Sequence, residues 1–95
     1  MQMEVTETFQ TWQIKLKDLV VRARIQARIE RLRGGNPGHH RVLTEGVTEL
    51  KLDFGAGYRI YYTQRNETLI ILLVGGDKST QQTDIKIAIQ LAKNL

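Results

Sequence analysis

The sequence contains no cysteine, which excludes disulfides, thiolate metal sites and cysteine nucleophiles. This composition is compatible with a cytoplasmic protein, and we expect that location. The longest unbroken aliphatic run, Leu69 to Val74, is far shorter than the roughly 20 residues of a membrane-spanning helix. The N-terminus carries Glu4 and Glu7 and has no apolar stretch, so it does not resemble a secretory signal. We therefore expect no membrane partner.

The length and composition indicate one small globular domain covering residues 1–95. The chain has 95 residues, of which 41% are hydrophobic and 25% charged, and these values argue against disorder and against several domains. A chain of this length buries only roughly 60–65% of the surface that it exposes when unfolded. Nearly every periodic apolar residue must therefore serve a single core.

Positive charge is concentrated in one segment of the chain. The net charge is +4, and the segment from Val20 to Arg33 holds five arginines against Glu30 alone. These arginines are Arg22, Arg24, Arg28, Arg31 and Arg33. One interpretation is a solvated helix face, and the other is a surface for phosphate backbones or for an acidic protein.

The first third of the sequence predicts a short edge strand and two helices. Residues 1–5 are compatible with the strand, and Thr6 or Thr8 is placed to cap a first helix. Asp18 is placed to cap a second helix, which Gly34 ends. Helical spacing predicts these buried positions: Phe9, Trp12, Leu16 and Leu19 in the first helix, and Val21, Ile25, Ile29 and Leu32 in the second.

The rest of the sequence predicts four strands and a closing helix. Apolar residues alternate with polar ones in the strand segments 41–43, 47–54 and 58–63, and the segment 69–74 is apolar on both faces, as in an interior strand. Ser79 and Gln82 have the spacing of a capping box, with Ile85, Ala88, Leu91, Ala92 and Leu95 on one helix face. The expected fold is α+β, in the order β-α-α-β-β-β-β-α. Its twisted, largely antiparallel sheet packs against two N-terminal helices and a C-terminal helix.

Alternation also separates polar side chains from the apolar face of the sheet. Glu49 and Lys51 fall on the face opposite Leu50, and Arg59 and Tyr61 share the outward face of the next strand. The simplest interpretation is a set of cross-strand ion pairs on an exposed sheet face.

Several motifs resemble those of a known family. They include the run from Gly57 to Tyr62 (GYRIYY), the run from Gly75 to Gln81 (GGDKSTQ), and Asp84-Ile85. Together with Phe9 and Trp12, the arginine-rich segment, the Gly35–Gly38 turn and the Gly46–Leu50 strand start, they are similar to the addiction-module killer proteins (HigB-like). That family belongs to the RelE/ParE toxin superfamily, and the resemblance spans nearly the whole chain.

The resemblance implies a RelE/ParE-like fold and the toxin of a type II toxin–antitoxin system. Such a toxin is neutralised by a small cognate antitoxin encoded beside it. It most often acts as a ribosome-dependent endoribonuclease that cuts messenger RNA and inhibits translation. The expected partners are therefore an antitoxin, the ribosome and messenger RNA. Cleavage by attack of a ribose 2′-hydroxyl on phosphate needs no metal and no cofactor.

The candidate catalytic residues lie on the outward sheet face and just after the last strand. Arg59 and Lys78 suit neutralisation of the phosphorane, and Lys51 adds a third positive charge. Glu49 is the candidate general base, and Tyr61 can donate a hydrogen bond or stack on a base. We expect the outward side chains to face solvent, and the cationic groups of Arg59 and Lys78 to converge at one end of the sheet.

The remaining candidates concern binding and the alternatives to catalysis. Arg24, Arg28 and Arg31 run along one helix flank and are candidates for contact with RNA or antitoxin. His39 and His40 adjoin a Pro-Gly turn, where histidines are more often merely polar. Two alternatives to a nuclease are a ParE-like inhibitor of DNA gyrase and a non-toxic module that only binds antitoxin.

Overall fold

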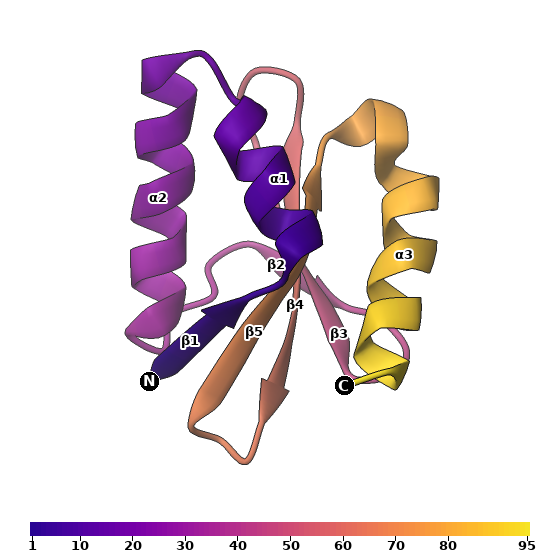
Figure 1. Cartoon of the computed structure of the whole chain (residues 1–95). Helices are drawn as coiled ribbons and strands as arrows, with labels where there is room; N and C mark the ends of the chain where they lie inside the picture. The colour runs from indigo at the N-terminus through magenta and orange to yellow at the C-terminus, as the bar shows by residue number, and fades with distance from the viewer.

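The computed structural model describes all 95 residues as one α+β domain (Figure 1). The elements follow the expected order: β1 (Gln2–Val5), α1 (Glu7–Lys15), α2 (Leu19–Arg33), β2 (His40–Val42), β3 (Val47–Leu52), β4 (Tyr58–Arg65), β5 (Leu69–Gly76), the short 3-10 helix η1 (Lys78–Thr80) and α3 (Gln81–Lys93). The strands form one sheet in the order β1-β5-β4-β3-β2. Only the β1–β5 pair is parallel, so the expected largely antiparallel sheet is confirmed.

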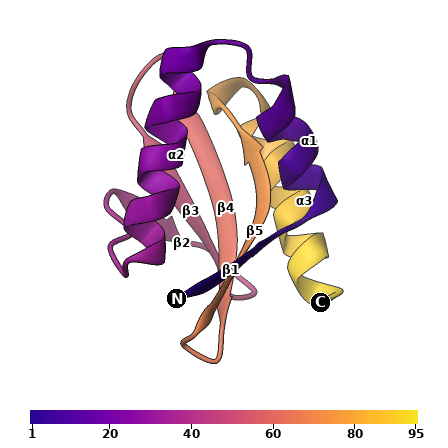
Figure 2. The ribbon, with the colours of Figure 1, turned by 60° about the vertical axis from the view of Figure 1, so that its left-hand side comes forward.

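The sheet lies between two helical layers, as Figures 1 and 2 show. On one face, Phe9 of α1 and Ile25 and Ile29 of α2 pack with Leu50 of β3 and Ile60 of β4. The other face belongs to α3. There, two small residues of α3, Ala88 and Ala92, pack against Val47, Tyr61, Ile71, Leu73 and Val74. Each face of the sheet is therefore covered by a helix layer.

Local capping explains where the first two helices begin. The Thr6 hydroxyl accepts a hydrogen bond from the Phe9 amide (3.0 Å) and donates one to the Leu73 carbonyl of β5 (2.6 Å). The Asp18 carboxylate accepts from the amides of Val20 and Val21. Both expected caps are confirmed, since a polar side chain before a helix satisfies otherwise unpaired amides.

Three details of the expected helices are wrong. Leu19 is the first residue of α2 and is 77% exposed, because the chain turns after Lys15 and leaves this position outside the core. The capping box before the last helix is formed by Asp77 and Thr80, and not by Ser79 and Gln82. Leu95 follows α3 and is exposed, so it takes no part in the apolar face of that helix. None of the helices combines the length and the apolar character needed to span a membrane.

Gly75 allows α1 to lie directly on β5. A Cβ atom at this position would collide with the indole ring of Trp12 in α1. That ring also contacts Phe9, with 5.5 Å between the ring centroids. The absence of a side chain at Gly75 is therefore required by the close approach of α1 to the sheet.

We expect Gly75→Ala to destabilise the protein, because the added methyl group must displace a packed aromatic ring. Overpacking of this kind costs about 1–3 kcal/mol of the free energy of unfolding, which urea denaturation will measure. Gly34→Ala is the matched control. At Gly34 the nearest atom lies 3.5 Å from the added Cβ, so that substitution should be neutral or slightly stabilising. Equal stability of the two variants would contradict the packing role of Gly75.

Candidate functional site

The polar face of the sheet that we expected to be exposed is buried in the structure. Glu49 and Tyr61 have no exposed surface and Arg59 is 6% exposed. The expectation that these side chains face solvent is wrong. Alternation correctly places them on one face of the sheet, but α3 packs on that face. We refer to Glu49, Arg59, Tyr61 and the nearby Asp84 as the buried polar cluster.

Glu49 joins three elements through its carboxylate. Its Oε2 accepts a hydrogen bond from Nε2 of Gln81, the first residue of α3 (3.0 Å). Its Oε1 lies 3.2 Å from Nη2 of Arg41 in β2. A buried carboxylate must be paired to offset its loss of hydration. In this arrangement Glu49 has no surface that a ribose hydroxyl can reach, and it holds α3 and β2 to β3.

Tyr61 lies beneath α3 with an unpaired hydroxyl. The phenol oxygen is buried and has no hydrogen-bond partner of good geometry. Burial, and after it the negative charge of Glu49, raises the pKa of Tyr61 well above its usual range. Because the side chain has no exposed surface, its ring is not available to stack on a nucleotide base.

Arg59 folds back over the start of its own strand. Its Nη1 donates to the carbonyls of Gly57 (3.0 Å) and Tyr58 (3.1 Å), while its Nε is buried without a partner. Unpaired buried donors are rare in native proteins. The guanidinium consequently lies at the end of the sheet where β4 begins and retains donor capacity.

Lys78 and Lys51 reach the same end of the sheet. Lys78 is exposed, and its alkyl chain lies against Gly57, where an added Cβ would come within 2.8 Å of Lys78 Cγ. The Lys78 amide also donates to the Ala56 carbonyl (3.4 Å). Lys51 is half-buried and is the cross-strand partner of Arg59. We call Lys51, Arg59 and Lys78 the sheet-end cations; in Figure 1 they belong to the upper end, where the β3–β4 loop meets the start of η1.

Asp84 is a member of the buried polar cluster that sequence reasoning missed. The residue is 9% exposed, and its Oδ2 accepts a hydrogen bond from the Thr80 hydroxyl (2.6 Å). The carboxylate sits directly on Gly76, where a Cβ atom would collide with it. Burial raises the pKa of Asp84. The sequence signals are the glycine at the end of β5 and the presence of Asp84-Ile85 among the family motifs, but spacing does not identify the two as partners.

The three candidate arginines of α2 differ in their contacts. Arg28 donates from Nη1 to the Lys51 carbonyl (2.8 Å) and from Nη2 to the carbonyls of Pro37 (2.8 Å) and His39 (3.1 Å). These bonds hold α2 to β3 and to the loop before β2, and the contact of Arg28 with a partner stays a prediction. Arg24 lies over the Phe54 ring, 4.5 Å from its centroid, and lines a hollow of about 290 Å³ with Arg31.

The histidines occupy an exposed turn, and His39 has a specific partner. Its Nδ1 lies 2.7 Å from Oδ2 of Asp53, whose pKa is held below the usual range by this hydrogen bond. The His40 Nδ1 pairs with the Gly38 carbonyl (2.7 Å). The first contact joins the turn before β2 to the β3–β4 loop, and the second stays within the turn. No group of three His, Asp or Glu side chains is arranged to hold a metal ion.

The raised pKa of Asp84 predicts a pH dependence of stability. A folded-state pKa above the unfolded value means that the folded chain binds more protons, so this carboxyl lowers stability as pH rises through that window. We expect Asp84→Asn to be more stable than the wild type at pH 7, with the difference shrinking as the solution is acidified toward pH 4. Urea denaturation at both pH values measures this. A variant less stable than the wild type at pH 7 would show that the ionised carboxylate is favourable.

Comparison with known proteins places the whole domain in a family. Residues 8–95 match the family described as phage-derived protein Gp49-like (DUF891). The chain is also 50% identical over 94 residues to an uncharacterized protein of Haemophilus influenzae, an alignment that covers 99% of this chain and 95% of that protein. The match includes all of α2, the sheet from β2 to β5 and α3. The chain therefore belongs to the Gp49-like family of phage-derived proteins.

Proposed function

We propose that the protein is the HigB-like toxin of a type II toxin–antitoxin pair and inhibits translation by cutting messenger RNA on the ribosome. The proposal rests on the family membership and on one structural observation. Three cationic residues from β3, β4 and η1 lie at one end of the sheet, because Lys51 and Arg59 are cross-strand partners and the Lys78 alkyl chain lies against Gly57. Such a cluster is suited to the charge of a phosphodiester.

In the proposed reaction a ribose 2′-hydroxyl gives its proton to water as its oxygen attacks the adjacent phosphorus, and the bond to the 5′-oxygen breaks as that oxygen takes a proton from water. The products are a 2′,3′-cyclic phosphate and a 5′-hydroxyl. Negative charge increases on the non-bridging oxygens, where the exposed Lys78 is free to make contact and the nearly buried Arg59 adds positive charge from the start of β4. Lys51 strengthens the positive potential from the neighbouring strand. The reaction requires no metal and no cofactor.

The buried polar cluster has a supporting part in this proposal. Glu49 is enclosed by Arg41 and Gln81, and Tyr61 is protonated beneath α3. Neither side chain contacts RNA in this arrangement of α3. They hold α3 against the sheet. Lys78, which directly precedes α3, is thereby kept at the end of the sheet where Arg59 lies.

The proposed partners are a small antitoxin, the ribosome and messenger RNA. Arg24 and Arg31 line the hollow of about 290 Å³, where they can contact phosphate or carboxylate groups of a partner. The complete burial of Glu49 and Tyr61 favours a second candidate function, a module that binds antitoxin without catalysis. Cleavage assays separate the two functions directly.

We expect Lys78→Gln to reduce message cleavage by about 10²–10³-fold, the usual cost of removing one preorganised donor to a charged transition state. The fold should be unchanged, because Lys78 is exposed and surface substitutions shift stability by only about 0.5 kcal/mol. Primer extension on messages translated in a purified system measures the cleavage rate. Circular dichroism and thermal unfolding check the fold.

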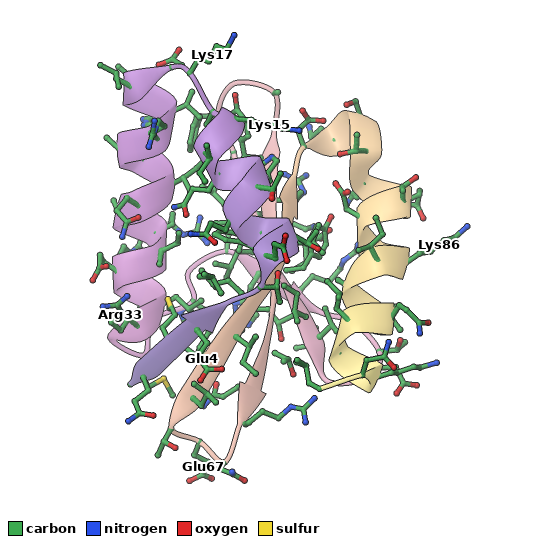
Figure 3. The ribbon with its side chains drawn as sticks, in the orientation of Figure 1. Glu4, Lys15, Lys17, Arg33, Glu67 and Lys86 are labelled. Carbon is green, nitrogen blue, oxygen red and sulfur yellow. The ribbon has the colours of Figure 1, made fainter.

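Lys86→Gln is the matched control for this experiment. Lys86 is also exposed, belongs to α3 and points away from the sheet (Figure 3). Lys86→Gln should retain wild-type cleavage. This result would separate the effect of the change at Lys78 from a general effect of losing one positive charge. Equal activity of the two variants would remove Lys78 from the site. A wild-type chain that binds an antitoxin but leaves every message intact would favour the non-catalytic function.

A further inference from the structure

His39 and Asp53 form a polar pair at the surface beside the sheet-end cations. Nδ1 of His39 lies 2.7 Å from Oδ2 of Asp53, and the two side chains are 57% and 64% exposed. The pKa of Asp53 is lowered, mainly by this hydrogen bond and further by positive charges that include Arg59 and Lys51. An ionised carboxylate has no hydrogen to donate, so Nδ1 of His39 carries the hydrogen of this bond.

The bond to Asp53 determines the state of the opposite ring nitrogen of His39. With the hydrogen on Nδ1, Nε2 of the neutral ring has a lone pair and can accept a proton. The ring makes its hydrogen bond through Nδ1 and more than half of the side chain is exposed, which leaves Nε2 for a substrate. Enzymes use this arrangement, an imidazole oriented by a carboxylate, for a general base.

The backbone places His39 in one row with two of the sheet-end cations. The Lys51 amide donates to the His39 carbonyl (2.9 Å), which continues the pairing of His40 with Leu50. Arg59 is the partner of Lys51 on the next strand. Because neighbouring strands lie about 4.8 Å apart, the backbones of His39 and Arg59 are separated by about 10 Å. Side chains from both positions can therefore reach the same nucleotide.

The β3–β4 loop, residues 53–57, connects the same pair to Lys78. Asp53 directly follows β3, and it contacts His39. Three residues later, the Ala56 carbonyl accepts a hydrogen bond from the Lys78 amide (3.4 Å). The loop lies at the upper end of the sheet in Figure 1. It thus holds an imidazole on one side and the exposed cation on the other.

We infer that His39 is the general base of the proposed cleavage and that Asp53 is its positioning residue. Nε2 of His39 takes the proton of the ribose 2′-hydroxyl, in place of water, as the 2′-oxygen bonds to phosphorus. The bond from phosphorus to the 5′-oxygen breaks, and that oxygen takes a proton from water. The imidazolium then returns its proton to water. This inference rests on the proposed function.

The other groups of the site cannot perform this proton transfer. Glu49 and Tyr61 have no exposed surface. His40 is a neighbour of His39 in the same turn, but its Nδ1 pairs with the Gly38 carbonyl and not with a carboxylate. Only His39 combines an exposed imidazole with a carboxylate that orients it.

His39→Gln tests the general base, and His40→Gln is its matched control. The rate of the chemical step is measured in a single turnover, with excess toxin on ribosomes that hold a defined message. We expect His39→Gln to lower this rate by about 10²–10⁴-fold, the usual contribution of general base catalysis, and His40→Gln to leave it nearly unchanged. A message with a 2′-deoxynucleotide at the cleavage site should be bound equally by the wild type and both variants, because the base acts only in the reaction.

The hydrogen on Nδ1 gives a measurement of the role of Asp53 that does not depend on activity. Heteronuclear NMR of the imidazole nitrogens distinguishes the two neutral forms of His39. We expect the Nδ1–H form in the wild type, and we expect Asp53→Asn to lose this preference and at least about tenfold in cleavage rate. Glu67→Gln is the matched control, since it also removes one exposed carboxylate, at the opposite end of the sheet (Figure 3).

The outcomes separate the general base from the proposed function. Wild-type cleavage by His39→Gln, together with loss of cleavage by Lys78→Gln, would overturn the general base and leave the nuclease intact. Equal loss in His39→Gln and His40→Gln, or a wild-type His39 without hydrogen on Nδ1, would also overturn it. A wild-type chain that cuts no message would contradict the proposed function and the general base together.

Discussion

The enclosure of the Glu49 carboxylate is the interaction on which the arrangement of the site depends. A carboxylate without exposed surface is tolerated only where partners replace its hydration. Arg41 supplies a positive charge from β2 and Gln81 supplies a hydrogen bond from the first residue of α3. This one side chain thus links the edge of the sheet to the helix that covers it. Removal of either partner would leave the buried carboxylate without one of the groups that replace its hydration.

The same packing determines the chemistry of its neighbours. Because α3 covers this face, burial raises the pKa values of Tyr61 and Asp84 above their usual ranges. Arg59 turns to backbone carbonyls at the start of β4 and leaves Lys78 as the exposed cation at this end of the sheet. The buried polar residues of the sheet therefore act mainly as a scaffold.

The positive charges of the chain have different physical roles that their number does not reveal. Arg28 donates to three carbonyls and connects α2 to β3 and to the loop before β2. Arg24 stacks on Phe54, and Arg22 lines a hollow between α1 and α2. Partner recognition depends on donors that remain free after folding, so the sum of charges in α2 overstates the binding capacity of that helix.

The sequence by itself determined the elements, their order and the face on which each strand residue lies. Thr6 and Asp18 cap helices through contacts within a few residues, and alternation along β3 and β4 depends only on backbone geometry. Such features are local, so a linear pattern encodes them. Only the tertiary structure decided that α3 covers Glu49 and Tyr61, that Trp12 rests on Gly75 and that Asp84 rests on Gly76. These outcomes depend on which distant surfaces pack together, and the periodicity of one segment carries no information about what covers it.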